Sequence, residues 1–347
     1  MDKKKKKRSL LLSMLFLLLL FILTYFIIFR NIPLDSVFGI ISSADIRFVC
    51  AAFLMIPLYF LIYGYFCCET LRFKGCRISI LKGITYACTD FYFSAITPSA
   101  TGGQPMAVYY MTKDKIPASA ATLSTVLLTV LFKVVLILLN AVALIFYGDV
   151  WLGGGTLFVI LWFFGLTMCS GVVALGLITA FNQKLILSVG DKFIRFGAKL
   201  RVIKDPEKTR ESYARFASEY KQAAEDIKGH KGFLLKLIFI ILVQRLAYFS
   251  VAFFVYRSFG QKEFSYFYFV AVQAFIALSV DSLPLPGGMG ANEAAIIMMY
   301  QDTFGAEKAA GAMLLIRFAN YYFGLIISAA FTIGNHIRHS LVTKKVS

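Results

Sequence analysis

Charged side chains are scarce in this 347-residue sequence, at 16% of the residues, whereas soluble domains carry about 25%. Hydrophobic residues make up 59%, Phe alone occurs 35 times, and the mean hydropathy is +0.73. The apolar residues gather in runs of about 20, the length that a helix needs to cross ~30 Å of hydrocarbon. These features exclude a soluble domain and predict an integral membrane protein.

The sequence also has little that would hold a metal or a nucleotide. Its three histidines lie in polar segments and form no metal-ligand set, and its six cysteines, none at ligand spacing, are interpreted as small hydrophobic residues. The phosphate-binding motif G-x-x-x-x-G-K-[S/T] does not occur. We therefore expect no metal and no cofactor. Any transport would be driven by a gradient, by the membrane potential or by lipid concentration.

Acidic residues are few as well, 19 against 36 Lys and Arg, which leaves a formal net charge of +17. Most of the basic residues fall in five segments: 3–8, 72–82, 113–115, 181–231 and 338–345. This placement is typical of the cytoplasmic side of a membrane protein, where positive charge also meets anionic lipid headgroups. Because no basic stripe interleaved with aromatic residues occurs, we expect no nucleic-acid partner.

Six apolar stretches are predicted to cross the membrane: about 9–29, 45–67, 118–147, 156–180, 232–258 and 307–335. The first is too long for a signal peptide and has no small-residue cleavage site, so it is interpreted as a retained span. Six crossings from a cytoplasmic N-terminus return the C-terminus to the cytoplasm, and all five basic segments then lie inside. The basic segment 181–231 is too small for an independent catalytic domain and is interpreted as helices near the membrane surface.

Two other apolar regions, 83–112 and 264–302, are interrupted by Gly and Pro. Their sequences ITPSATGGQPMAVYYM and SLPLPGGMGANEAAIIMMY share a Pro, a Gly-Gly pair and a short apolar helix that ends in Met and Tyr. Pro breaks a helix, Gly permits positive φ, and the freed backbone groups must face protein or a wet cavity rather than lipid. We predict two re-entrant hairpins; the alternatives are Pro-kinked spans or ordinary loops.

In this topology the two hairpins enter from opposite sides of the membrane. The sequence is therefore interpreted as one integral membrane domain, 1–347, made of two inverted halves, 1–147 and 148–347. The predicted fold class is an all-α polytopic membrane protein, with about six transmembrane helices and two re-entrant hairpins in an inverted repeat. Such paired broken helices are typical of secondary transporters that bind their substrate near the midplane.

A few ionisable residues interrupt the apolar regions: Asp90, Lys133, Arg245, Asp281, Glu293 and Arg317. Buried charges in a membrane face the bundle interior or a wet cavity, and Arg grips phosphate well. The cations are interpreted as a site for an anionic headgroup; the carboxylates balance them, recognise an amine or take up a proton. The alternative is that these charges form structural ion pairs, with Asn292 and Glu293 as plain helix caps. No catalytic residue is predicted, and the candidate substrate-binding residues are Gly102, Gly103, Gln104, Lys133, Arg245, Gly287, Gly288, Asn292, Glu293 and Arg317.

The segments ITPSATGGQP and LPLPGGMGANEAA resemble the signature segments of the lysylphosphatidylglycerol synthase transmembrane-region family, and the resemblance extends from about residue 9 to 335. The second segment, from Pro284 to Glu293, is the more specific. The resemblance implies a multi-pass protein of the bacterial plasma membrane that moves lipids between leaflets. Its Gly287, Gly288 and Glu293, with Arg317, match the region that carries the motif.

In larger members of that family, a soluble domain uses aminoacyl-tRNA to attach lysine to phosphatidylglycerol. This sequence ends at Ser347, so the resemblance supports the membrane part. We expect a flippase for an anionic or aminoacylated phospholipid, such as lysylphosphatidylglycerol, a lipid linked to resistance against cationic antimicrobial peptides. The alternative is a membrane component of phosphatidylglycerol lysyltransferase that needs a separate catalytic aminoacyltransferase. The expected partners are the phospholipid substrate and membrane lipids; a separate transferase and a homo-oligomer stay open.

Overall fold

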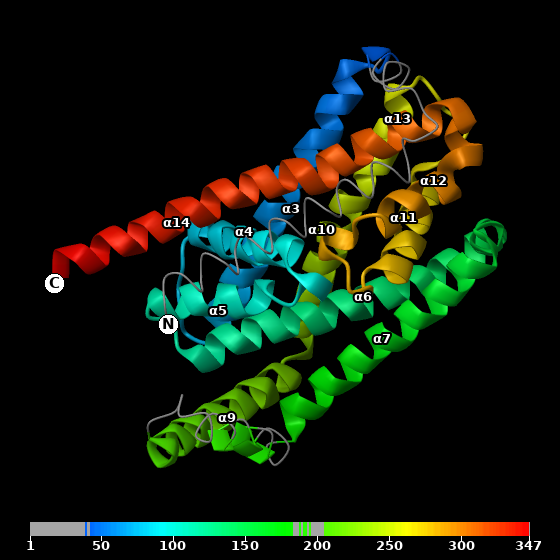
Figure 1. The fold of residues 1–347 in the computed structure, drawn as a ribbon. Coiled ribbons are helices and arrows are strands. Elements are labelled where there is room, and N and C mark those ends of the chain that lie inside the picture. The colour runs from blue at the N-terminus through cyan, green and yellow to red at the C-terminus, as the bar shows by residue number, and fades with distance from the viewer. Residues whose placement is uncertain are drawn as a thin grey trace.

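The computed structural model describes residues 39, 42–182, 187, 188, 190–192, 194, 195 and 205–346, and within these ranges all regular structure is helical (Figure 1). The first predicted span, 9–29, lies outside the described residues, as does most of 183–204.

Five helical stretches are long and apolar enough to cross a membrane. They are α3 (Ile46–Phe73), α6 (Ala118–Gly153), α7 (Gly155–Phe181), α10 (Lys231–Ser258) and a C-terminal stretch over Lys308–His339. This last stretch combines α13 (Ala306–Arg317), a π-helical segment (Phe318–Phe323) and α14 (Gly324–Val346). The predictions of helical spans at 45–67, 118–147, 156–180, 232–258 and 307–335 are thereby confirmed as long apolar helices.

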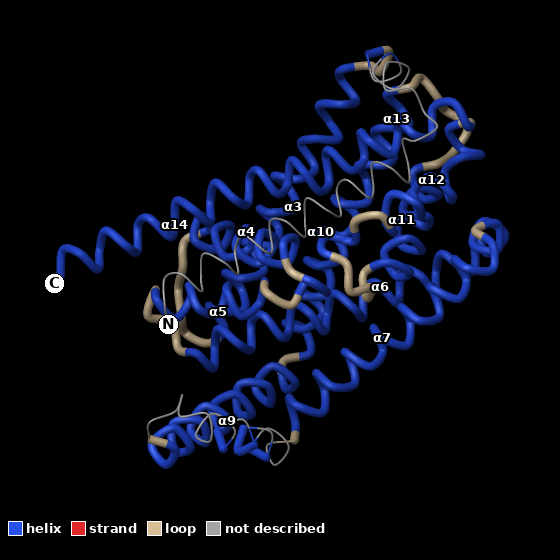
Figure 2. The backbone as a smooth tube through the Cα atoms, in the orientation of Figure 1, coloured by secondary structure: helices blue, strands red, loops and turns tan. Residues whose placement is uncertain are grey.

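The two Gly/Pro-rich regions each fold as two short helices joined by a turn. In the first half, α4 (Ile80–Ile96) and α5 (Gly103–Lys113) flank a 3₁₀ turn at Pro98–Ala100. In the second half, α11 (Tyr266–Val280) and α12 (Ala291–Phe304) flank a 3₁₀ turn at Pro286–Gly288. Figure 2 shows both breaks as loop segments among the helices. The predicted breaks are therefore present, and neither region forms one continuous span.

The helices of the two halves pack in a crossed pattern. Helix α3 packs against α10, and the two 3₁₀ turns contact each other. Helix α4 of the first half lies against α14 of the second, while α11 of the second half lies against α6 of the first. Each broken region therefore lies against a long helix from a distant part of the chain.

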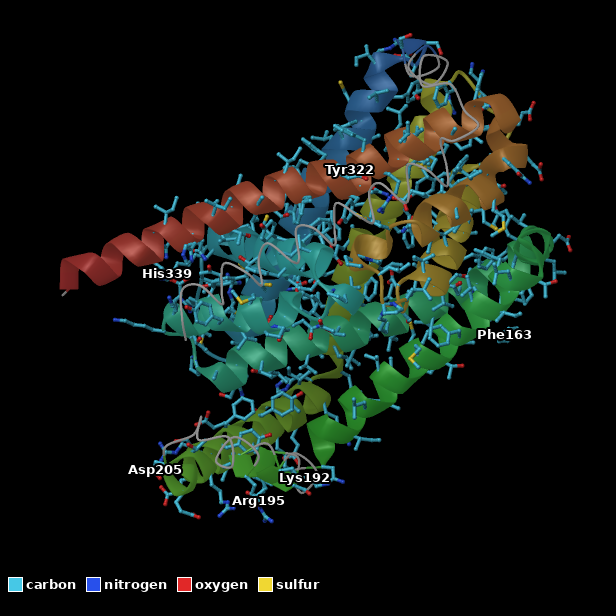
Figure 3. All side chains as sticks on the ribbon, viewed as in Figure 1. Phe163, Lys192, Arg195, Asp205, Tyr322 and His339 are labelled. Atoms are coloured by element: carbon cyan, nitrogen blue, oxygen red, sulfur yellow. The ribbon has the colours of Figure 1, made fainter. Side chains whose placement is uncertain are left out.

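Helix α7 joins this bundle through close backbone contact with α11. A Cβ atom at Gly165 would overlap the carbonyl group of Leu278, so only Gly fits there. Beside it, the buried Asn140 of α6 donates to the Ala274 carbonyl at 3.0 Å and accepts from the indole N–H of Trp162 at 2.8 Å. These contacts tie α6, α7 and α11 together. On the outer side of α7, Phe163 points away from the bundle (Figure 3).

The basic segment contains α9 (Pro206–Gly229), which packs against α6, α7 and α10. Its buried face, with Ala217 and Tyr220, meets Leu123 of α6. At its polar edge, Ser119 donates to Glu219 at 2.8 Å, and Lys74 pairs with Asp226 at 2.9 Å. Figure 3 places Lys192, Arg195 and Asp205 at the same end of the molecule as α9. The prediction of helix in 181–231 is confirmed for α9; a position at the membrane surface stays a prediction.

Asp114, directly after α5, contacts polar and basic side chains of α4 and α14. It accepts hydrogen bonds from Tyr86 at 2.6 Å and from Arg338 at 2.9 Å, and Lys82 lies 3.2 Å away. Burial raises the pKa of this carboxyl, but hydrogen bonds from Tyr86 and Lys82, together with the positive charges of Lys82 and Arg338, outweigh burial and hold the pKa below its ordinary value. The cluster thus ties the first broken region to α14.

We predict that replacing Gly165 by Ala weakens the docking of α7. The added methyl group must displace backbone, which costs about 1–3 kcal/mol of unfolding free energy. The matched control is Gly171→Ala on the same helix, where nothing lies within 4 Å; Ala there is neutral or mildly stabilising. Thermal unfolding of the detergent-solubilised variants measures the difference, and equal midpoints for the two would contradict the predicted contact.

We further predict an acid-sensitive contribution from Asp114. Because its folded-state pKa lies below the unfolded value of about 3.9, its charge stabilises the fold above that pH, and this stabilisation is lost as the pH falls through the lowered folded value. Between about pH 6 and pH 3, the unfolding midpoint of wild type should therefore drop further than that of Asp114→Asn. Asp149→Asn, an exposed carboxylate of α6, should behave like wild type. A parallel drop in wild type and Asp114→Asn would refute this contribution.

Candidate functional site

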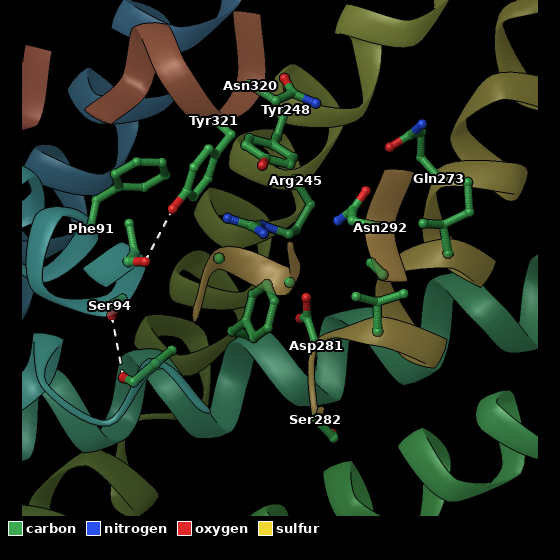
Figure 4. A pocket seen from close by; sticks show the side chains of 18 of the residues that line it. Phe91, Ser94, Arg245, Tyr248, Gln273, Asp281, Ser282, Asn292, Asn320 and Tyr321 are labelled. Atoms are coloured by element: carbon green, nitrogen blue, oxygen red, sulfur yellow. Dashed lines mark hydrogen bonds between the residues drawn. The ribbon is translucent and has the colours of Figure 1, made fainter. Parts of the chain in front are cut away.

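A cavity of about 600 Å³ lies where the two 3₁₀ turns meet. Side chains from both broken regions and from α3, α6, α7, α10, α13 and the π-helical segment line it. In Figure 4, Arg245 extends through the middle of this space, with Tyr248 on one side of it and Asp281 on the other. The polar or charged lining consists of Tyr59, Tyr63, Asp90, Ser94, Gln104, Thr129, Lys133, Gln244, Arg245, Tyr248, Gln273, Asp281, Ser282, Asn292, Arg317, Asn320 and Tyr321.

The second turn depends on three glycines in left-handed backbone conformations. Gly287, Gly288 and Gly290 have φ of 59°, 65° and 82°, a region that other residues rarely adopt. A Cβ atom at Gly287 would also overlap the ring of Tyr321. The turn can therefore lie directly on the π-helical segment. Gly287 and Gly288 both line the cavity; close approach of a ligand to these glycines stays a prediction.

The first turn is held by Thr97 and by close packing of Gly103. Thr97 is extended before Pro98, as the residue preceding a proline prefers, and its hydroxyl oxygen accepts from the amide of Gly102 at 2.9 Å. A Cβ atom at Gly103 would overlap Asp90 and Ser94 of α4. These two glycines therefore shape the turn from behind. Gln104, the next residue, reaches the cavity and donates to the hydroxyl of Thr129.

Arg317 and Glu293 form a buried ion pair beside the second turn. The Nε of Arg317 lies 2.6 Å from Oε1 of Glu293, and both side chains are only 4% exposed. The other carboxylate oxygen accepts from the amide of Gly290 at 2.7 Å, while the guanidinium donates to the Gly287 carbonyl at 3.2 Å. The pair thus satisfies backbone groups at the start of α12 and in the turn. Arg317 borders the cavity, and Glu293 lies behind it.

A second ion pair joins α6 to the end of α11. Lys133 Nζ lies 3.6 Å from Oδ2 of Asp281, and the Lys133 side chain is 14% exposed. Both residues line the cavity. The predicted cations at 133 and 317 are therefore each balanced by a carboxylate from the second broken region.

Arg245 is the cation that these pairs leave out. It is 8% exposed, its guanidinium lies 4.4 Å from the centre of the Phe132 ring, and Tyr59 and Tyr248 flank it at 5.2 and 5.4 Å. Its guanidinium donates a hydrogen bond to the side chain of neighbouring Gln244 at 3.4 Å, and its Nε has no hydrogen-bond partner. Within the part of the chain that the structure describes, no carboxylate forms an ion pair with it. The aromatic rings hold a desolvated positive charge facing the cavity.

A model of the lysylphosphatidylglycerol synthase TM region family matches residues 9–328, nearly the whole chain and both broken regions. The chain belongs to this family. Together with the five long apolar helices, this membership makes it a multi-pass membrane protein. Among curated proteins, no sequence matches the chain.

In this member of the lysylphosphatidylglycerol synthase TM region family, seven of the ten predicted binding residues line one cavity: Gln104, Lys133, Arg245, Gly287, Gly288, Asn292 and Arg317. Gly102, Gly103 and Glu293 are outside the lining and support it from behind. The candidate set omitted Asp90, Gln244 and the aromatic wall. Gln244 stands beside Arg245 in an apolar run, and Tyr59 and Tyr63 share one face of α3, so both signals were present in the sequence.

We predict that Arg317→Met destabilises this family member by about 3–5 kcal/mol, because it leaves Glu293 charged, buried and unpaired. The double variant Arg317→Met/Glu293→Gln removes both charges and should recover a large part of this loss. Denaturant unfolding in detergent, arranged as a double-mutant cycle, measures the coupling. Strictly additive losses would show that the two side chains do not depend on each other.

Proposed function

We propose that this protein moves a phospholipid between the leaflets of its membrane by holding the headgroup phosphate at Arg245. The observation that carries the proposal is a buried guanidinium with an unpartnered Nε in a cavity between two broken helix pairs. A buried charge is costly unless something balances it, and Arg suits phosphate through its planar fork of donors. An anionic headgroup supplies that balance.

The dimensions and walls of the cavity support a small polar headgroup. At about 600 Å³, its volume lies within the ~300–1,000 Å³ usual for small-molecule sites. The polar side chains of Gln104, Asn292 and Ser282 line the same cavity as the cations. Lipid acyl chains need no such site because they stay in hydrocarbon.

The arrangement of the helices supports a two-state transporter. We propose that the two short helix pairs are re-entrant hairpins and that the chain is an inverted repeat, in which α3, α4, α5 and α6 correspond to α10, α11, α12 and the α13–α14 stretch. Under this correspondence, α3 packs against its equivalent helix α10, and the two turns, which are also equivalent, contact each other. The contact between α4 and α14 has its equivalent in the contact between α11 and α6. Rocking of the halves about these contacts would switch access to the cavity between leaflets.

The positions of the described basic segments support a cytoplasmic C-terminus. Lys82, Asp114 and Arg338 meet in one cluster, and Lys74 meets α9 through Asp226. Segments far apart in the sequence thus bring their positive charges to the same end of the bundle, as the positive-inside rule requires.

Reconstitution into liposomes tests the proposal. We predict that Arg245→Gln slows leaflet transfer of fluorescent phosphatidylglycerol about tenfold or more, since a hydrogen-bonded charge pair contributes ~1.5–3 kcal/mol. The control is Arg257→Gln on the same helix, whose guanidinium lies over Phe48 and Phe253 and not on the cavity wall; its rate should equal that of wild type.

Two results would count against the proposal. Wild-type rates in folded Arg245→Gln would remove Arg245 from the mechanism. Absence of transfer by folded wild type with every phospholipid tested would contradict translocation itself and favour the membrane component of a lysyltransferase.

A further inference from the structure

The charges around the cavity do not all cancel within the protein. Asp281 pairs with Lys133, and Glu293 pairs with Arg317. This leaves Arg245 as an unpaired cation and Asp90 as an unpaired carboxylate among the described residues that line the cavity. One spare charge of each sign therefore faces the same space.

Asp90 is half-buried on the cavity wall, and only one of its two carboxylate oxygens has a hydrogen-bond partner. Tyr63 of α3 donates to Oδ2 at 2.9 Å, whereas Oδ1 is buried without a hydrogen-bond partner. Gly103 packs so closely against Asp90 that even a methyl group there would overlap it. The first turn therefore covers Oδ1 and holds the carboxyl group in place against α3. Because Asp90 lines the cavity, an ammonium group there would neutralise the charge of this carboxylate.

Aromatic rings connect the two spare charges. Tyr59 contacts both the Tyr63 and the Phe91 rings edge-on, with centroids 6.4 and 6.2 Å apart, and the Arg245 guanidinium lies 5.2 Å from the Tyr59 ring. Tyr59 and Tyr63 are one helical turn apart, a rise of ~5–6 Å along α3. Arg245 thus lies at the Tyr59 ring and Asp90 at the Tyr63 hydroxyl. The faces of aromatic rings also attract ammonium groups.

We propose that Asp90 is a specificity-determining residue that binds the ammonium group of a phospholipid headgroup while Arg245 binds its phosphate. This inference rests on the proposed translocation function and adds the recognition of the headgroup's ammonium group. The matching ligand is a headgroup in which a phosphate and an ammonium are separated by a few bonds, so that each neutralises one spare charge of the cavity. The tyrosine rings between the poles exclude water and strengthen both interactions.

The test compares two fluorescent lipids with identical acyl chains, phosphatidylethanolamine, which has an ammonium group, and phosphatidylglycerol, which has none. Wild type should transfer phosphatidylethanolamine faster, and Asp90→Asn should reduce that preference about tenfold, the equivalent of one charge-assisted hydrogen bond. The matched control is Asp302→Asn, which removes an exposed carboxylate of α12 away from the cavity; its preference should equal that of wild type.

Tyr63→Phe provides a second variant, because it keeps the ring and removes only the hydrogen bond to Asp90. A smaller loss of preference than in Asp90→Asn is expected, and it tests the inference even if Asp90→Asn does not fold.

Each remaining outcome overturns the inference in a recognisable way. An unchanged preference in folded Asp90→Asn, or an equal slowing of both lipids, excludes ammonium recognition by this residue. Absence of transfer of both lipids by wild type would contradict the proposed function itself, before any question of specificity arises.

Discussion

The buried pair of Arg317 and Glu293 is the interaction on which the second broken region depends. A chain that interrupts a helix inside an apolar bundle must find partners for the backbone groups that it frees. Here one ion pair supplies partners for two backbone groups of the turn: Glu293 accepts from the Gly290 amide, and Arg317 donates to the Gly287 carbonyl. The charges neutralise each other at 2.6 Å. The turn can therefore adopt its left-handed glycine conformations on top of Tyr321 and form a wall of the cavity.

The other charges divide into two groups with different roles. Lys133 and Asp281 neutralise each other and join α6 to α11, as Asp114 joins α4 and α5 to α14. These ion pairs stabilise the packing of the helices, because removing one partner would leave the other charge without compensation in an apolar environment. Arg245 is buried and Asp90 is half-buried, and neither forms an ion pair within the described part of the chain. Their cost is offset in the protein by aromatic rings and by the Tyr63 hydroxyl, and in our proposal it is offset further by the headgroup.

Much of the fold follows from local sequence properties. Long helices were predicted from the length and apolarity of five runs, since twenty or more consecutive apolar residues favour a helix that crosses the lipid. These runs are 45–67, 118–147, 156–180, 232–258 and 307–335. The breaks at Pro98 and at Gly287-Gly288 were equally visible, because Pro removes a donor and Gly permits positive φ wherever they occur. For the site, the same reasoning named ten candidate residues; seven of them line the cavity, and Gly102, Gly103 and Glu293 lie behind its wall.

By itself, then, the sequence determined the membrane class, the five described long helices, the positions of the two breaks and the short set of ionisable residues in apolar regions, because these depend on residues close together in the chain. Only the tertiary structure decided which charges pair. Lys133 meets Asp281 and Arg317 meets Glu293, while Arg245 and Asp90 stay apart from both pairs. No local pattern carries that information, since an ion pair depends on distance in space and its partners stand on different helices. The Gly/Pro breaks were first visible as interruptions of apolar sequence, and their packing against each other places the cavity between them.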